Sequence, residues 1–347
     1  MIPVKSFAAM DAASALVPYS FERRDLRPDD VQVEILFCGV CHSDLHQARN
    51  EWGGSMYPMV PGHEIVGKVA AVGNEVSKFK VGDTVGVGVI IDSCNTCKHC
   101  AADYEQYCLE GATGTYNAME RDGVTIAQGG YSSQIVVKQK FVLSVDDRLD
   151  LKAVAPLLCA GITTYSPLRF ANVQPGMKVA VIGLGGLGHM GVKFAVAFGT
   201  EVSVISHSPG KEEDARRLGA THFILSNNKE QMKQYANYFD VLLDTVSAPH
   251  DYSPFLGLLG LEGKLLTVGL PTEAPKVTPF SIITNRRSIV GSMIGSMQET
   301  QEMLDFCAEH NVVSDVELIS MQSINEAYER LLKNDVKYRF VIDMSTL

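Results

Sequence analysis

Apolar and polar positions along the first half of the chain fall in short runs, each of which predicts a β-strand. Val31–Leu36 alternates between apolar and polar side chains, which is the period of a half-buried strand. The runs Ile65–Gly73 and Val81–Val87 are similar and are broken by glycines that indicate tight bends. We therefore expect an all-β, barrel-like first half, with a cysteine-rich excursion from about residue 92 to 110.

From about residue 155 the pattern changes to strands that alternate with helices. Lys178–Ile182 is a short apolar run of the kind found in strands buried on both faces. The alternation predicts a parallel, doubly wound sheet, and therefore an α/β class for this half. Helices are expected at Gly188–Phe198, Lys211–Leu218 and Gln298–His310, and strands at Glu201–Ile205, Asp240–Asp244, Lys264–Gly269, Ser288–Gly291 and Tyr338–Asp343. We expect the last 50 residues to return to the first domain.

Composition narrows the function classes. A chain of 347 residues, 46% of them hydrophobic and 20% charged, is expected to fold as two globular domains. Its formal charge of −10 disfavours nucleic acid and acidic lipid as partners. No apolar run reaches the roughly 18 residues of a membrane span, and the first residues lack the features of a signal peptide. We therefore expect a cytoplasmic protein, in which clustered cysteines more often bind metal than form disulfides.

Four of the eight cysteines form a closely spaced quartet. Two-residue gaps separate the first three of them, and the fourth follows soon after: Cys94, Cys97, Cys100 and Cys108. Such spacing lets one loop wrap a tetrahedral ion, and four thiolates leave no open position for a substrate. The quartet predicts a closed structural zinc site. A redox-active cysteine pair is the rival interpretation, but it needs only two of the four.

A glycine-rich turn lies between a predicted strand and a predicted helix. It has the GxGxxG pattern, with the residues Gly183, Leu184, Gly185, Gly186, Leu187 and Gly188. The first glycine allows the turn, the second lets the backbone approach a pyrophosphate, and the third permits close helix–strand packing. The helix N-terminus adds partial positive charge. In this strand–turn–helix context, the pattern predicts dinucleotide binding.

The end of the next predicted strand indicates which dinucleotide is bound. An NAD enzyme presents Asp or Glu there to the ribose 2′-hydroxyl. This chain instead has Ser206, His207 and Ser208, with Lys211 close behind. An acid would repel a 2′-phosphate, whereas hydroxyls and a lysine accept one, so we expect NADP(H). A purely local role for Ser206, capping the next helix, is compatible with this expectation.

A second set of candidate metal ligands is scattered along the chain: Cys41, His63, Glu64 and Cys159. Two thiolates and one imidazole leave one zinc position for water or substrate, which is the arrangement of a catalytic site. Spacing alone does not distinguish this arrangement from ordinary buried cysteines.

Local sequence supplies the missing evidence. Several segments strongly resemble the zinc-containing medium-chain alcohol dehydrogenases, and among them the cinnamyl alcohol dehydrogenase-like branch. The resemblance covers nearly the whole chain and is carried by Gly39–His46 (GVCHSDLH), Tyr57–Gly67 (YPMVPGHEIVG), Pro156–Thr163 (PLLCAGIT), Gly183–Gly191 (GLGGLGHMG) and Tyr338–Asp343 (YRFVID).

The resemblance implies roles for the scattered set. Cys41, His63 and Cys159 are similar in position to the ligands of the catalytic zinc. Glu64 stands beside them and coordinates transiently during exchange. Asp44 resembles the carboxylate that orients the ligating histidine. With the quartet, this implies two zinc ions per chain.

The same resemblance implies a proton relay and contacts to the coenzyme. Ser43 resembles the hydroxyl that exchanges a proton with the substrate oxygen, and His46 resembles the outlet of that relay. His42 occupies a position that approaches the pyrophosphate. Thr163 lies where the family contacts the nicotinamide, and Arg339 lies where it contacts the phosphates.

The family also implies the architecture. A GroES-like β-barrel catalytic domain, residues 1–155 and 293–347, would carry both zinc sites, and a Rossmann domain, residues 156–292, would bind the coenzyme. Relatives of this type form homodimers through the coenzyme domain by pairing the strand near Ser288–Gly291. One departure concerns the pocket, because this chain has Gly114 where cinnamyl-type relatives often carry a large aromatic residue. Trp52 is a candidate for the pocket wall or for packing.

The expected activity is the NADP(H)-dependent interconversion of primary alcohols and aldehydes, aromatic or medium aliphatic. Three alternatives remain open from sequence. A zinc-free quinone or enoyl reductase has the same fold, and a polyol or secondary-alcohol dehydrogenase has the same site. A non-enzymatic zinc-binding redox or interaction module is the alternative from another class.

Overall fold

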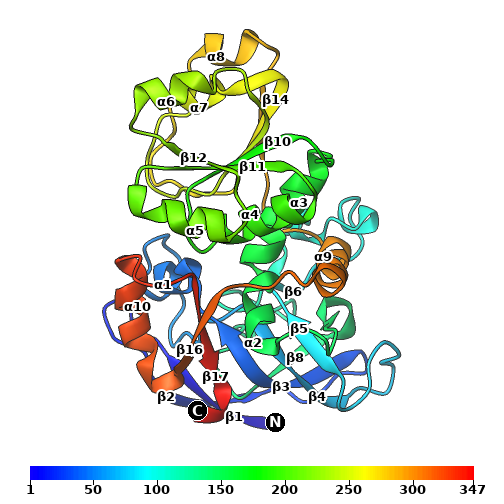
Figure 1. Cartoon of the computed structure of the whole chain (residues 1–347). Coiled ribbons are helices and arrows are strands. Elements are labelled where there is room, and N and C mark those ends of the chain that lie inside the picture. The colour runs from blue at the N-terminus through cyan, green and yellow to red at the C-terminus, as the bar shows by residue number, and fades with distance from the viewer. The chain divides into compact units, whose positions relative to one another are not determined.

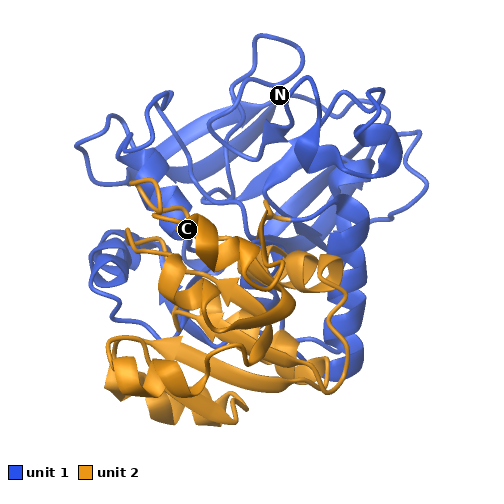
Figure 2. Ribbon diagram, turned by 90° about the horizontal axis from the view of Figure 1, so that it is seen from above, with its two compact units in different colours: residues 1–159, 295–347 blue, residues 160–294 orange.

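The computed structural model describes residues 1–347, which divide into two compact units. Unit 1 comprises Met1–Cys159 and Gly295–Leu347, and unit 2 comprises Ala160–Ile294 (Figure 2). The last part of the chain therefore belongs to the same unit as the first. None of the helices has the length and apolar character that crossing a membrane requires.

Unit 1 is built on a seven-stranded sheet. Its strand order is β16-β17-β3-β4-β5-β9, with β8 pairing against β3. All pairs are antiparallel except β16 with β17. The strands are β3 (Asp30–Gly39), β4 (Ile65–Val72), β5 (Thr84–Val87), β8 (Gln134–Lys138), β9 (Leu143–Ser144), β16 (Val316–Ser320) and β17 (Arg339–Asp343).

Two small sheets and four α-helices complete unit 1. The strand pairs are β1 (Ile2–Ala8) with β2 (Val17–Arg23), and β6 (Ile90–Asp92) with β7 (Thr113–Gly114). The helices are α1 (His42–Ala48), α2 (Leu151–Val154), α9 (Met297–His310) and α10 (Ile324–Leu332). Ser296 caps α9 in a capping box with Glu299, which explains why the helix begins there.

Unit 2 contains a parallel six-stranded sheet in the order β12-β11-β10-β13-β14-β15, so the predicted doubly wound sheet is confirmed. Its strands are β10 (Lys178–Ile182), β11 (Glu201–Ser206), β12 (His222–Leu225), β13 (Phe239–Asp244), β14 (Leu259–Thr267) and β15 (Ser288–Gly291). The helices lie on both faces, α4 and α5 on one and α6 and α7 on the other (Figure 1). They are α3 (Ala160–Phe170), α4 (Gly188–Ala197), α5 (Glu212–Arg217), α6 (Lys229–Gln234), α7 (Ser253–Leu256) and α8 (Pro279–Ile283).

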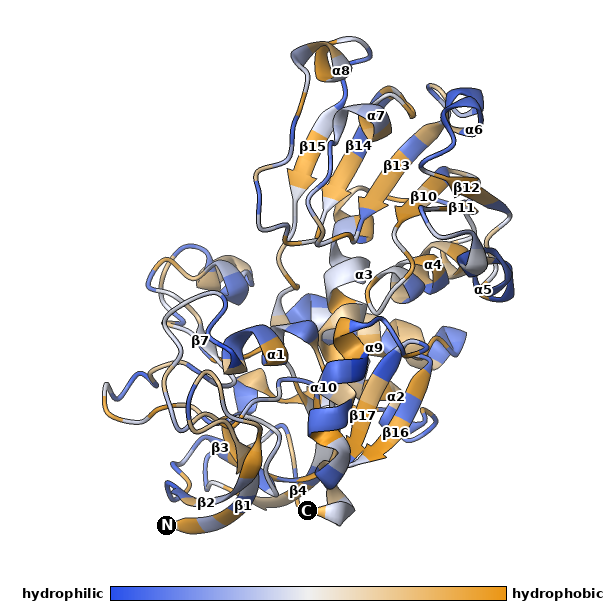
Figure 3. Ribbon diagram, turned by 90° about the vertical axis from the view of Figure 1, so that its left-hand side faces the viewer, coloured by the Kyte–Doolittle hydropathy of each residue, from blue (hydrophilic) through white to orange (hydrophobic).

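The apolar runs of the sequence form the core of unit 2. Ile182, Ile205, Leu242 and Leu265, from the four central strands, are at most 3% exposed. Figure 3 shows these strands as largely hydrophobic, whereas α5 and α6 are largely hydrophilic. A strand buried on both faces must be apolar throughout, because neither face meets water.

Five elements of unit 2 were not predicted, namely strand β12 and helices α3, α6, α7 and α8, of which the last three are only four to six residues long. Strand β12 has only four residues and begins at His222, so it gives a weak apolar signal. Helix α3 contains Pro167, which sequence reasoning takes as a helix boundary. The helix tolerates this proline, and nine of its eleven residues are buried.

Candidate active site

The cysteine quartet gathers in a lobe of unit 1 between β6 and β7. The sulfur atoms of Cys94, Cys97, Cys100 and Cys108 all lie within 4.8 Å of one another. The lobe contains little regular structure, only the 3₁₀ turns Cys100–Ala102 and Glu105–Tyr107. Four convergent thiol donors fit a tetrahedral zinc ion, with no position left for a fifth group.

The backbone of the lobe points hydrogen-bond donors at the sulfurs. The amide of Cys97 donates to Cys94 Sγ at 3.3 Å, and the amide of Leu109 donates to Cys97 Sγ at 3.4 Å. The amide of Cys94 donates to Cys108 Sγ at 3.4 Å. Hydrogen bonds from the backbone amides of Cys100 and Leu109 lower the pKa of Cys97 to about 6. Donors of this kind stabilise thiolates, which is the form that binds a metal.

The second candidate metal set also converges, although its members are far apart in the sequence. Donor atoms of Cys41, His63, Glu64 and Cys159 lie within 4.8 Å of one another. Cys41 precedes α1, the histidine and glutamate precede β4, and Cys159 precedes α3. A hydrogen bond from Cys159 lowers the pKa of Cys41 well below that of a free thiol and raises that of Cys159. Two sulfurs, an imidazole and a reserve carboxylate fit a zinc site with an open position.

Asp44 holds this cluster in shape. Its carboxylate is fully buried and accepts hydrogen bonds from the amides of Cys41 at 2.9 Å and Gly62 at 3.1 Å. It also faces His63 Nδ1 at 3.0 Å and accepts the hydroxyl of Tyr131 at 3.2 Å. Because Nδ1 is engaged by the carboxylate, Nε2 of His63 is the nitrogen left for a metal.

Glu64 and Arg339 form a fully buried ion pair beside the cluster, in which Arg339 Nη2 donates to Glu64 Oε1. Burial raises the pKa of Glu64 to about 7, against the opposing charge of Arg339. The second carboxylate oxygen, Oε2, is buried without a hydrogen-bond partner. Gly39 leaves room for this carboxylate, because a Cβ atom there would lie 1.9 Å from Oε2. A buried carboxylate oxygen without a hydrogen-bond partner fits a side chain that coordinates a metal ion transiently.

Helix α1 carries the remaining candidate residues of unit 1. His42 is exposed, and Ser43 Oγ lies 3.6 Å from Cys41 Sγ. The ring of His46 lies 5.1 Å from that of Trp52, which is 46% exposed. Trp52 is therefore not a core packing residue, and its role in the pocket wall stays a prediction.

Sequence reasoning missed Glu51, whose carboxylate lies 2.5 Å from His46 Nδ1. It also missed Tyr131 on Asp44 and Tyr116, whose ring stacks on His63 at 5.8 Å. Glu51 lies beyond the end of α1, and a spacing of five residues is not one at which helical side chains meet, so the sequence contained no signal for this contact. No local signal pointed to the two tyrosines.

The glycine-rich turn follows β10 and leads into α4, as predicted. Gly183 has φ +88°, which favours glycine, and a Cβ atom on Gly188 would lie 2.1 Å from the carbonyl oxygen of Gly183. At Gly185, nothing lies within 4 Å of where a Cβ atom would be. One glycine thus makes the turn, one permits close packing, and one leaves backbone open to a ligand, which fits a pyrophosphate.

The predicted coenzyme-selecting residues lie at the carboxyl end of β11. Ser206 is 7% exposed, and its hydroxyl accepts the amide of Ser208 at 3.2 Å. His207 is exposed, and Ser208 and Lys211 are half-buried. Ser206 does not cap the next helix, because Ser208 is the N-cap of the 3₁₀ turn Pro209–Lys211 and Lys211 is the N-cap of α5. Thr163, 9% exposed, lies in α3 of the same unit.

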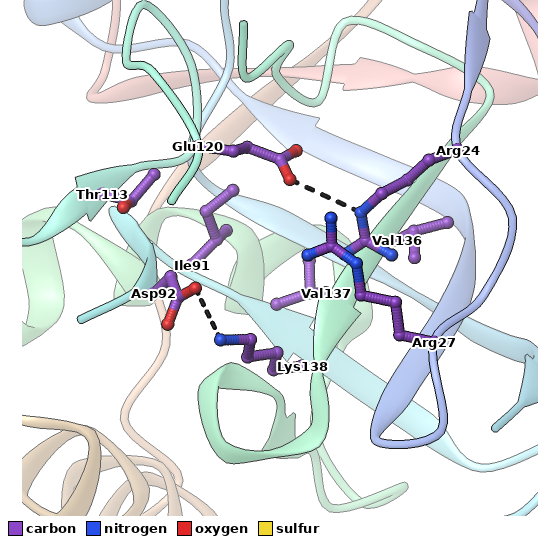
Figure 4. Close-up of a pocket in the computed structure, with 9 residues that line it drawn as sticks. All are labelled: Arg24, Arg27, Ile91, Asp92, Thr113, Glu120, Val136, Val137 and Lys138. Atoms are coloured by element: carbon purple, nitrogen blue, oxygen red, sulfur yellow. Dashed lines mark hydrogen bonds and ion pairs between the residues drawn. The ribbon is translucent and has the colours of Figure 1, made fainter. Parts of the chain in front are cut away.

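A separate cavity of unit 1 holds none of these residues. Arg24, Arg27, Asp92, Glu120 and Lys138 line it together with apolar neighbours (Figure 4). Each of the five charged side chains belongs to an ion pair, such as Arg24 with Glu120 and Lys138 with Asp92. The cavity therefore offers no unpaired charge to a ligand.

A parallel sheet with a glycine-rich turn that fits a dinucleotide, a closed metal site of four cysteines and an open metal site of cysteine and histidine together define a zinc-dependent dehydrogenase. Comparison with known proteins agrees. Residues 27–147 match the alcohol dehydrogenase GroES-like domain, and residues 186–309 match the zinc-binding dehydrogenase family. The chain belongs to the zinc-containing medium-chain alcohol dehydrogenases, in the cinnamyl alcohol dehydrogenase-like branch, and is an oxidoreductase. The predicted family and fold class are confirmed.

Three relatives illustrate the similarity. The chain is 53% identical to NADP-dependent alcohol dehydrogenase C 1 of Mycolicibacterium smegmatis, over 100% of this chain and 99% of the relative. A cinnamyl alcohol dehydrogenase of Sorghum bicolor superposes with a TM-score of 0.96 at 48% identity, covering 99% of this chain and 98% of that one. The cinnamyl alcohol dehydrogenase of Helicobacter pylori, solved with NADP(H), has a TM-score of 0.93 at 43% identity, covering 99% of both chains.

Proposed function

We propose that this protein is an NADP(H)-dependent zinc alcohol dehydrogenase that works as a reductase of aldehydes to primary alcohols. The observation that carries the proposal is the convergence of Cys41, His63 and Cys159 in one buried cluster whose histidine is oriented by Asp44. This cluster and the cysteine quartet would each hold one zinc ion. The proton relay and both metal sites would then belong to unit 1, and most of the residues assigned to the coenzyme would belong to unit 2.

When bound, the zinc ion would act as a Lewis acid on the substrate oxygen, and the nicotinamide would exchange the hydride. The chain's own residues then have separate tasks. Cys41, His63 and Cys159 fix the place of the substrate oxygen, and Asp44 fixes the histidine ring. Glu64, with its unpartnered oxygen, takes part in the exchange of water and product.

Proton transfer is assigned to residues of α1 and the loop after it. Ser43 exchanges a proton with the substrate oxygen without ionising, because it only passes the proton on to His46. The carboxylate of Glu51 lies at His46 Nδ1 and orients the ring, so that His46 can pass the proton on to water.

We assign the coenzyme contacts to the glycine-rich turn, His42, Thr163 and Arg339. The 2′-phosphate of the coenzyme is assigned to residues at the end of β11. His207, Ser208 and Lys211 would meet this phosphate, with Ser206 shaping the loop beneath them. The relative from M. smegmatis and the structure from H. pylori, named with NADP, support this choice.

We predict that the wild-type enzyme prefers NADPH, and that Ser206→Asp reverses this preference. A charge-assisted hydrogen bond is worth about 1.5–3 kcal/mol, so one contact gives roughly 10- to 150-fold discrimination. The new carboxylate would repel the phosphate and accept the 2′-hydroxyl of NADH. Lys211→Ala should weaken NADPH binding and leave NADH binding nearly unchanged. The measurement is kcat/KM for both coenzymes, and a wild-type ratio near one would refute the assignment.

A homodimer is proposed through unit 2. Strand β15 is the edge of its sheet and pairs only with β14. Next to it in the chain, Phe280 and Ile283 of α8 are 74% and 67% exposed. An open strand edge with exposed apolar side chains nearby is a surface that a second copy of the chain would cover.

We predict that Phe280→Ala raises the dimer dissociation constant by roughly 30-fold, since a buried aromatic anchor contributes about 2 kcal/mol or more. Light scattering across a dilution series measures the change. Val124→Ala is the matched control, because Val124 is 82% exposed but lies in unit 1. A protein that is monomeric at every concentration would contradict the proposal.

The deciding experiment is a panel of aldehydes and alcohols assayed with NADPH and with NADH, alongside metal analysis. Turnover of primary aldehydes with NADPH supports the proposal. Preference for polyols or secondary alcohols would favour that alternative, and turnover without zinc would favour a quinone or enoyl reductase. Gly114 predicts a wide pocket and therefore a broad set of accepted aldehydes. A cytoplasmic location is part of the proposal and follows from the sequence expectation.

A further inference from the structure

The loop Thr245–His250, which follows β13, packs against the glycine-rich turn. Thr245 Oγ1 donates to the carbonyl oxygen of Ile182 at 2.8 Å. A Cβ atom on Gly183 would lie 2.8 Å from Val246 Cγ2, and one on Gly188 would lie 3.2 Å from Thr245 Oγ1. The position of the turn therefore depends on the position of this loop.

The other side of the loop is attached to Asp244, the last residue of β13, whose side chain is buried. Asp244 Oδ1 accepts the amide of Val246 at 3.1 Å, and Oδ2 lies 3.1 Å from His250 Nε2. The other ring nitrogen, His250 Nδ1, lies 2.8 Å from the carbonyl oxygen of Ala248. The imidazole is 17% exposed and packs beside the rings of Tyr252 and Phe255.

This geometry requires one shared proton. A carbonyl oxygen only accepts, so His250 Nδ1 must carry a hydrogen toward Ala248. A second hydrogen must then lie between Nε2 and the carboxylate, either on the ring or on Asp244. If that hydrogen is lost, two acceptors face each other in a buried place, which costs free energy.

The surroundings favour retention of this proton. Burial raises the pKa of Asp244. The other titratable groups near His250 are Tyr252, the exposed carboxylate of Asp251, and Lys276, whose carbonyl oxygen accepts the amide of Tyr252. Asp244 therefore keeps a proton to higher pH than an exposed carboxyl group does.

We propose that His250 is a positioning residue for the coenzyme: through a proton shared with Asp244, it holds the loop Thr245–His250 against the glycine-rich turn, and loss of this proton as the pH rises weakens dinucleotide binding. The inference rests on the proposed coenzyme role of unit 2. It assigns no contact between His250 and the coenzyme itself.

The test measures NADPH and NADH dissociation constants by coenzyme fluorescence from pH 6.5 to 10. The affinity of the wild type should fall about tenfold along the alkaline limb, the part of the profile in which the shared proton is lost. The fall should be equal for NADPH and NADH, because the proposed effect does not involve the 2′-phosphate that distinguishes them. His250→Gln keeps a donor to Asp244 but does not titrate, so its affinity should be flat with pH. His250→Phe fills the space without a donor and should bind about tenfold more weakly at every pH, with KM raised and kcat nearly unchanged.

His222→Gln is the matched control. His222 lies 3.4 Å from Glu201 at the amino ends of the strands of the same sheet, away from the turn, and its replacement should leave the alkaline limb intact. If the wild type and His250→Gln show the same alkaline limb, the inference is wrong.

Hydrogen exchange of the coenzyme-free protein tests the loop by itself. After correction for intrinsic rates, protection of segments 183–188 and 245–250 should fall with pH in the wild type and stay constant in His250→Gln. Equal behaviour of the two proteins would overturn the shared proton. If exchange differs as expected but neither coenzyme binds, the coenzyme role of the inference is overturned together with the proposed function, while the loop attachment stands.

Discussion

Cys41→Ser is expected to reduce turnover to the limit of detection while leaving a folded protein that still binds NADPH. The variant removes one of two thiolates from a site that keeps a position open for substrate, so the remaining donors hold zinc weakly. Coenzyme binding depends on the parallel sheet of unit 2, which does not include this residue. Metal analysis should find one zinc ion fewer per chain, with the circular dichroism spectrum and the NADPH dissociation constant nearly unchanged.

Cys97→Ser is the matched comparison, because it removes one thiol from the other cluster. Zinc at a closed site contributes its binding free energy to folding. This variant should therefore lower the melting temperature and the yield of folded protein before it affects the chemistry of the molecules that remain folded. Full activity of Cys41→Ser, or fewer than two zinc ions in active wild-type protein, would contradict the assignment of the two sites.

Ser43→Ala is expected to lower kcat by roughly 10²–10⁴-fold, the usual contribution of a positioned acid–base group, with zinc content unchanged. The hydroxyl lies 3.6 Å from Cys41 Sγ but is not one of the clustered donors. Loss of the Ser43 hydroxyl should therefore interrupt proton transfer while the metal site stays intact. The measurement is single-turnover reduction of an aldehyde, which isolates the chemical step from product release.

Two further variants separate the relay from simple packing. Ser43→Thr restores a hydroxyl and should recover most of the lost rate. Glu51→Gln keeps a hydrogen-bond partner for His46 Nδ1, so it should lower the single-turnover rate much less than Ser43→Ala does. Near-normal single-turnover rates in Ser43→Ala would refute the relay.

Local patterns predicted much of the fold. The apolar runs of β10, β11 and β13 mark strands that are buried on both faces, and the glycines between β10 and α4 mark a turn that no other residue could make so tightly. The four clustered cysteines could also be interpreted directly, because they lie on one loop. In each case, the residues that determine the structure are neighbours in sequence.

The open metal site could not be predicted from spacing, because its ligands meet only after distant elements pack. Cys41 and Cys159 are buried cysteines like Cys38 until the fold brings them to His63. The resemblance to a family, not a physical pattern, identified them. His250 went unnoticed for the same reason, since its role depends on a carboxylate at the end of a strand and on the carbonyl of a loop residue.

The lobe that carries the cysteine quartet has a consequence for the supply of metal. Its backbone makes two 3₁₀ turns, and Asn95, Asp103 and Gly111 have positive φ angles, a shape with little apolar core of its own. A ligand that binds only the folded state adds free energy in proportion to the logarithm of its concentration. Each tenfold rise in free zinc above the dissociation constant therefore stabilises this lobe by about 1.4 kcal/mol. Zinc starvation and heating should consequently open the same segment, which makes the lifetime of the enzyme a function of the zinc available around it.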